Sequence, residues 1–135
     1  MTYLNRYAPV LGRVLITLVF VMSGLGKVTG FAATAGYIQS KGLPLPEAAA
    51  IIAIVIELGG SLMLIFGWKM RPVAAILLLY TVVVAFVFHK FWAVPPEQFM
   101  NQMNHFFKNI SMAGGLLYVV TYCGIAPGTE RRERK

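Results

Sequence analysis

One carboxylate in this sequence stands in the middle of an apolar segment. Glu57 lies about ten residues from either end of the stretch 46–66 and is its sole interior charge. An acidic residue at the centre of a membrane helix costs on the order of 3 kcal/mol, unless it is protonated or bonded to a basic group on another helix. Two roles stay open for Glu57. It is either a proton- or redox-linked catalytic carboxyl in a cavity, or a pin to Arg13 or Lys27.

The first apolar segment carries the basic and hydroxyl groups that could meet this carboxylate. Arg13 and Lys27 fall within one stripe at helical spacing, and Ser23 lies at its edge. Arg13 and Lys27 are 14 positions apart, which is roughly 21 Å along a helix, so they belong to opposite membrane surfaces. Each could instead extend its charged end to lipid headgroups, which is the commoner behaviour of such residues.

A second group of polar side chains follows the third and fourth apolar segments. His89 and Trp92 come directly after one segment, and His105, Lys108 and Asn109 begin the next. His105 and Asn109 are four residues apart and therefore share a helix face. Interfacial anchoring is the favoured interpretation for His105 and Lys108, and Trp92 suits the headgroup zone. For His89 we favour a polar role facing the helix bundle.

Several kinds of chemistry are excluded by residue type and spacing. The two histidines lack any metal-ligand spacing, so no metal site is expected. The single cysteine, Cys123, rules out dithiol exchange by this chain alone. The sequence has no phosphate-cradling glycine loop and no Ser-His-Asp arrangement. It implies no covalently held cofactor.

The composition is that of a membrane protein. Of its 135 residues, 58% are hydrophobic and only 13% are charged, about half the charged share of a soluble domain. The mean hydropathy of +0.70 excludes a soluble enzyme, a disulfide scaffold and a disordered chain. The net charge of +7 comes from basic residues placed singly between apolar runs, apart from the C-terminal cluster. Anionic lipid headgroups are thus the expected partners, and nucleic acid is not.

The apolar pattern predicts an all-α membrane protein built as a bundle of four transmembrane helices. The expected spans cover about 9–28, 46–66, 72–88 and 105–122. A short interfacial helix is expected near 31–38, and a loop over 90–104. Residues 1–127 then form one membrane domain, followed by a basic cytoplasmic tail over 128–135.

Charge placement predicts the orientation of this bundle. With four spans, both termini share one side with the hairpin that carries Lys69 and Arg71. That side holds eight basic residues, and the opposite side holds four. The positive-inside rule therefore places both termini in the cytoplasm.

Short pieces along nearly the whole chain resemble the bacterial DoxX family of small four-helix membrane proteins. They are Arg13, Ser23-Gly24-Leu25-Gly26-Lys27, Ala35-Gly36-Tyr37, Lys41-Gly42-Leu43-Pro44, Glu57-Leu58-Gly59-Gly60, Gly67, Arg71-Pro72, His89 with Phe91-Trp92, and Lys108-Asn109 with Gly114-Gly115. The resemblance implies a multi-pass protein of the bacterial inner (plasma) membrane. Family members have been linked to membrane oxidoreductase assemblies, including thiosulfate:quinone oxidoreduction and a complex that handles oxidative and thiol stress.

Two functions follow from this resemblance as expectations. In the first, the chain is a quinone- or thiol-redox-linked subunit of such an assembly, with a bound quinone and an oxidoreductase partner or a second copy of itself. Glu57 would handle the proton, and Lys27 and His89 would bind quinone oxygens or an anionic substrate. The quinone ring would lie among Phe88, Phe91 and Trp92. In the second, the chain is a non-enzymatic assembly factor or a carrier of a small molecule or lipid.

Overall fold

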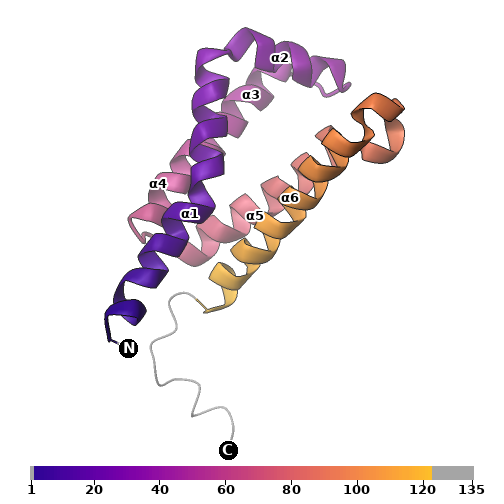
Figure 1. Ribbon diagram of the computed structural model, residues 1–135. Helices are drawn as coiled ribbons and strands as arrows, with labels where there is room; N and C mark the ends of the chain where they lie inside the picture. The colour runs from indigo at the N-terminus through magenta and orange to yellow at the C-terminus, as the bar shows by residue number, and fades with distance from the viewer. Residues whose placement is uncertain (1, 123–135) are drawn as a thin grey trace, which may run out of the picture.

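The computed structural model describes residues 2–122, and this part of the chain is entirely helical (Figure 1). Cys123 and the basic tail over 128–135 lie outside the described residues. The elements in chain order are α1 (Thr2–Thr29), α2 (Phe31–Ser40), α3 (Pro46–Ile54), the π-helical turn η1 (Val55–Gly59), α4 (Gly60–Ile65), α5 (Met70–Phe88), the 3-10 turn η2 (Phe91–Ala93) and α6 (Pro96–Tyr122).

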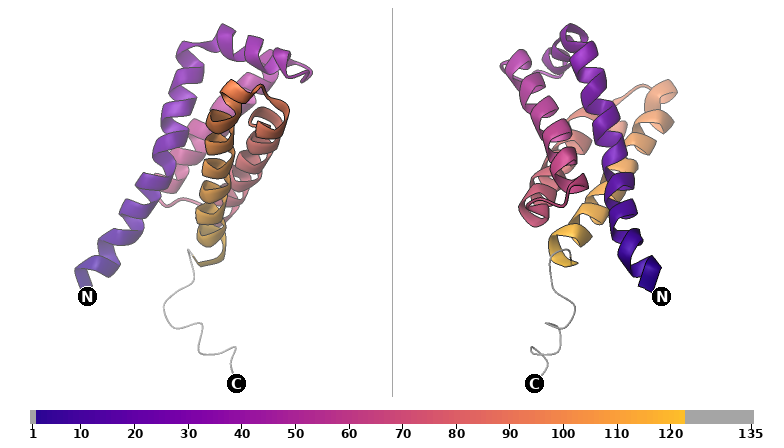
Figure 2. Two further views of the ribbon diagram at one scale, coloured as in Figure 1. Left: turned by 45° about the vertical axis from the view of Figure 1, so that its right-hand side comes forward. Right: turned by 90° about the vertical axis from the view of Figure 1, so that its left-hand side faces the viewer.

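Four helical rods run lengthwise through the molecule, and one short helix lies across an end. The rods are α1, the continuous α3–η1–α4 segment, α5 and α6 (Figures 1 and 2). Helix α2 turns away from α1 at the end of the molecule opposite the N-terminus. The start of α1, the α4–α5 hairpin and the end of α6 all lie at the other end.

Three of the helical segments are long and apolar enough to cross a membrane. They are Tyr7–Thr29, Pro46–Ile65 and Met70–Ala93. Large apolar side chains point outward from all three, for example Leu15, Leu62 and Leu79. Outward leucines suit lipid, because hydrocarbon tails replace the water that would penalise them in a soluble protein.

Two helices extend beyond their apolar segments. Helix α6 begins at Pro96, nine residues before the start expected from hydropathy, so most of the expected 90–104 loop is helical. The reason is that hydropathy measures burial in lipid and not helicity. Proline is favoured at the first helical position, and Glu97 in the first turn complements the helix dipole. Helix α1 likewise begins at Thr2 and includes Pro9.

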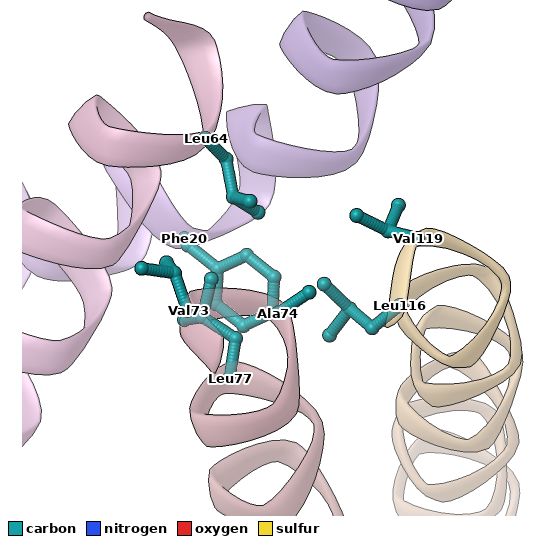
Figure 3. Packing of buried hydrophobic residues seen from close by; sticks show 7 residues of the cluster. All are labelled: Phe20, Leu64, Val73, Ala74, Leu77, Leu116 and Val119. Carbon is teal, nitrogen blue, oxygen red and sulfur yellow. The ribbon is translucent and has the colours of Figure 1, made fainter. Parts of the chain in front are cut away.

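A buried apolar cluster joins the four rods at the end that holds the α4–α5 hairpin (Figure 3). Its members come from α1, α4, α5 and α6: Phe20, Leu64, Val73, Ala74, Leu77, Leu116 and Val119. Helices α5 and α6 pack along each other, whereas α1 touches α6 only slightly. Glu57 and the polar side chains bonded to it lie in the other half of the molecule, between this cluster and α2.

Candidate functional site

The α3–η1–α4 rod changes its hydrogen-bonding pattern at the residues around Glu57. Val55–Gly59 form a π-helical turn between two α-helical segments. Such turns are rare and occur often at functional sites, because the wider turn redirects a side chain. Glu57 is 3% exposed and points from this turn into the protein interior. The sequence analysis did not predict the π-helical turn.

Helix α1 packs unusually close to this turn because it has a glycine at the contact. A Cβ atom added to Gly24 would lie 2.7 Å from the Leu58 side chain and 3.4 Å from Cβ of Glu57. On the other side of the rod, a Cβ atom on Gly60 would lie 3.1 Å from Leu77 of α5. These small residues bring three helices within reach of one carboxylate.

Glu57 accepts hydrogen bonds from side chains on two other helices. Lys27 Nζ lies 2.9 Å from Oε2 and 3.0 Å from Oε1, forming an ion pair. Ser23 Oγ donates to Oε1 at 3.2 Å and itself accepts from the Lys27 ammonium. The Tyr80 hydroxyl of α5 donates to Oε1 at 2.7 Å. We call these four residues the carboxylate network.

Lys27, and not Arg13, is therefore the basic partner of Glu57. Arg13 lies at the other end of α1, beside the α4–α5 hairpin. Its Nη1 donates to Met70 Sδ at 3.3 Å, and its Nε donates to the Pro9 carbonyl at 3.2 Å. Arg13 thus belongs to the hairpin end of the molecule and takes no part in the carboxylate network.

The carboxylate network opens into a cleft of about 740 Å³. Helices α1, α2, α3, α5 and α6 line it, and most of its wall is apolar. Its apolar lining includes Phe20, Ile38, Ala53, Val83, Val84 and Phe88. Lys27, Ser23, Glu57 and Tyr80 all lie on its surface. A cavity of this size, with apolar walls and a few convergent polar groups, is typical of a small-molecule site.

A second group of polar residues lines the same cleft farther from the core. His89, His105, Lys108 and Asn109 all contribute to its wall, and we call them the rim cluster. The rings of His89 and His105 stack with centroids 5.0 Å apart. His89 Nδ1 lies 2.9 Å from Gln102 Oε1, which fixes the ring and favours a proton on Nδ1 because an amide oxygen only accepts.

The aromatic lining differs from the expected one. Of Phe88, Phe91 and Trp92, only Phe88 lines the cleft. Trp92 packs against Phe91 and Phe106 and borders a separate shallow pocket over η2. Phe91 and Trp92, which were expected to flank the site, do not line this cleft, because they lie on the 3-10 turn that follows α5 and border the other pocket. Tyr37 of α2, which contacts Phe88, takes their place in the cleft.

Sequence reasoning missed Tyr80 as a member of the site. The sequence holds a signal for it, since Tyr80 and Thr81 interrupt an otherwise aliphatic and aromatic run in the third apolar segment. Thr81 uses its hydroxyl on its own helix, donating to Leu77 O at 2.6 Å. Only Tyr80 reaches across to another helix.

The chemistry available in the cleft is hydrogen bonding and proton exchange. Within residues 2–122, no three histidine, cysteine or acidic side chains are grouped closely enough to hold a metal ion. The Lys27 ammonium and the Tyr80 hydroxyl carry exchangeable protons at the cleft surface. Glu57 Oε2 accepts one hydrogen bond, from Lys27, and so retains capacity for another.

Comparison with known proteins establishes the family. The sequence profile of the DoxX family matches residues 8–90. The chain belongs to the DoxX family. It is 35% identical over 107 residues to the Escherichia coli inner membrane protein YphA, covering 79% of this chain and 76% of that protein. It is 32% identical over 120 residues to E. coli inner membrane protein YqjF, covering 87% and 85% of the two chains.

A eukaryotic relative matches a shorter part of the chain. The Surfeit locus protein 4 homolog of Schizosaccharomyces pombe is 33% identical over 72 residues, which are 52% of this chain and 24% of that protein. No solved structure matches. This DoxX-family chain is a multi-pass protein of the inner membrane, like YphA and YqjF.

Proposed function

We propose that this DoxX-family protein binds a lipid-soluble quinone in its cleft and acts as a subunit of a membrane oxidoreductase assembly. One observation supports this most: the largely apolar cleft contains a buried carboxylate that is hydrogen-bonded to a lysine, a serine and a tyrosine. A quinone needs the same combination, with apolar walls for its ring and tail and polar groups for its carbonyl oxygens.

In this proposal the carboxylate network manages protons. Reduction of a quinone to a quinol takes two electrons and two protons. On binding, the Lys27 ammonium and the Tyr80 hydroxyl would each turn one hydrogen bond from Glu57 to a quinone oxygen. Each would deliver one proton and then regain a proton from water, while the Glu57 carboxylate keeps the two groups close to the ligand. In this proposal a partner subunit supplies the two electrons. A second copy of the chain is the other partner we consider.

A second candidate function is that of a non-enzymatic carrier or assembly factor. The completeness of the carboxylate network favours it. Lys27 directs hydrogen bonds to Ser23 and to both Glu57 oxygens, so the ammonium is fully used within the protein. A network that is complete without a ligand could serve only to join α1, η1 and α5.

We also propose that α6 is a fourth span, over about 105–122, and that both termini are cytoplasmic. The antiparallel packing of α6 along α5 supports this assignment. It places α2 and the rim cluster on the non-cytoplasmic side. A membrane-impermeant thiol reagent should label Cys123 only after the cytoplasmic face is exposed. Labelling in intact cells would contradict this orientation.

Quinone binding is tested most directly on purified protein in lipid nanodiscs. We expect Tyr80→Phe and Glu57→Gln to weaken ubiquinone binding by roughly 3- to 10-fold, the worth of about one hydrogen bond. The matched controls are Tyr118→Phe and Glu97→Gln, because both residues are exposed and lie outside the cleft. Equal affinities in all four variants would refute a quinone held by the network. Unchanged binding in Tyr80→Phe, together with loss of folding in Glu57→Gln, would favour the second function.

A further inference from the structure

The rim cluster lies outside the carboxylate network, and its positive charge is not neutralised. Among the side chains that the structure describes (residues 3 and 7–122), the only ion pair that joins a basic group to a carboxylate is Lys27–Glu57. Lys108 and His105 therefore have no acidic partner in this part of the chain, although both line the cleft. The Lys108 ammonium, which has no carboxylate beside it, attracts an anion, and the His105 ring can add a hydrogen bond from its N–H group.

An amide in the same cluster faces the cleft without a protein partner. Asn109 is 8% exposed and lines the cleft, and its side chain makes no hydrogen bond to another described side chain or backbone group. Its amide is not fully enclosed, because Ser61 Oγ is the only enclosed side-chain nitrogen or oxygen without a partner among the described residues. The Nδ2 group of Asn109 can therefore donate a hydrogen bond to an oxygen of a ligand in the cleft.

The distance between the two polar groups of the cleft indicates an amphipathic ligand. His89 comes directly after α5, nine residues beyond Tyr80, and nine residues of helix measure roughly 13 Å. Val84 and Phe88 form the wall between them. A ligand whose acidic group meets the rim cluster would thus lay a hydrocarbon portion along this wall.

We infer that the rim cluster is a binding subsite for the carboxylate or phosphate group of an amphipathic lipid, held by Lys108, His105 and Asn109. His89 stacks on His105 and, tied to Gln102, keeps that ring in place. The subsite rests on the proposed function in one respect, namely that the cleft binds ligands. It adds the acidic chemistry of the head group, which quinone binding does not require.

The probes are palmitate and its methyl ester, which share a chain and differ in charge. Wild-type protein in phosphatidylcholine nanodiscs should bind palmitate about two- to fivefold more tightly than methyl palmitate, because the Lys108 side chain is exposed and solvent weakens an exposed charge contact. Lys108→Gln should remove this preference. Lys90→Gln is the matched control, since Lys90 is exposed at the same end of the molecule and lies outside the cleft.

The outcomes separate the two proposals. Equal binding of palmitate and its ester by the wild type, or the same loss in both lysine variants, would overturn the anionic subsite and leave the cleft intact. Binding of neither probe would overturn the lipid subsite and, if ubiquinone also fails to bind, the proposed function with it.

Inorganic phosphate distinguishes the source of the anion. Displacement of palmitate by millimolar phosphate in the wild type would show that a free anion also occupies the site. If phosphate does not displace palmitate, the site is restricted to lipid head groups. Both results support the subsite if Asn109→Leu, with wild-type thermal stability, weakens palmitate binding by about threefold or more. Unchanged palmitate binding in that variant would remove Asn109 from the subsite.

Discussion

Replacing Lys27 by methionine should destabilise the protein far more than replacing Glu57 by glutamine. The Glu57 side chain is 5% exposed and the Lys27 side chain 22%. Loss of Lys27 leaves a carboxylate buried at a helix centre with only neutral donors, and removing one partner of a buried pair costs about 3–5 kcal/mol. Because Lys27 is partly exposed, we expect a value near the lower end, about 3 kcal/mol.

Glutamine at position 57 removes the buried charge and keeps an acceptor oxygen for Tyr80 and Ser23. The Lys27 ammonium that loses its partner sits near the end of α1, which ends at Thr29, so it can turn toward the headgroups. We therefore expect Glu57→Gln to cost only about 1 kcal/mol. In the double variant the methionine should cost much less than about 3 kcal/mol, since no buried charge remains to be compensated.

Reversible unfolding in mixed micelles of sodium dodecyl sulfate, followed by tryptophan fluorescence, measures these differences. Trp68 and Trp92 lie at opposite ends of α5 and report on both ends of the bundle. Lys90→Met serves as the control for loss of one charge outside the network. Equal destabilisation by Lys27→Met and Glu57→Gln, or simple additivity in the double variant, would refute the reasoning that Glu57 is a buried ion compensated by Lys27.

Three further predictions concern packing. Gly24→Ala should cost about 1–2 kcal/mol, because its Cβ would contact a neighbouring side chain at 2.7 Å, whereas Gly26→Ala, with nothing within 4 Å, should be neutral in the same assay. Leu64→Ala, at a fully buried site, should cost about 2–5 kcal/mol, and Leu62→Ala, on the exposed face of α4, less than about 1 kcal/mol. Thr81→Val should change the unfolding free energy by less than about 1 kcal/mol, since the hydroxyl bonds only to its own helix; a larger loss would show that it has another partner.

The membrane class and the main apolar helices could be predicted from the sequence because they depend on local composition. Glu57 stood out because a lone acid in an apolar segment has few physical explanations. The start of α6 could not be predicted in this way, since residues 97–104 are helical although five of the eight are polar. Hydropathy identifies apolar segments and therefore does not detect the polar first turns of α6.

The candidate site was predictable in part. From the sequence, either Arg13 or Lys27 could have been the partner of Glu57. The close packing of α1 at Gly24 brings Lys27, and not Arg13, to the carboxylate. The hydrogen bond from Tyr80 to Glu57 depends on how α5 is rotated relative to the π-helical turn. No local sequence pattern determines that rotation. The position of Trp92 outside the cleft could not be predicted either, because it depends on the conformation of the 3-10 turn Phe91–Ala93.

Mass spectrometry of the protein extracted gently with its own lipids tests the central claim most directly, that the cleft binds a lipid-soluble molecule. We predict a quinone or acidic lipid enriched over the bulk membrane in the wild type. It should be lost in Val84→Trp, which fills the cleft, and kept in Leu79→Trp, which adds the same side chain on the exposed lipid-facing side of α5. No enrichment in the wild type, or equal retention in both variants, would contradict the account.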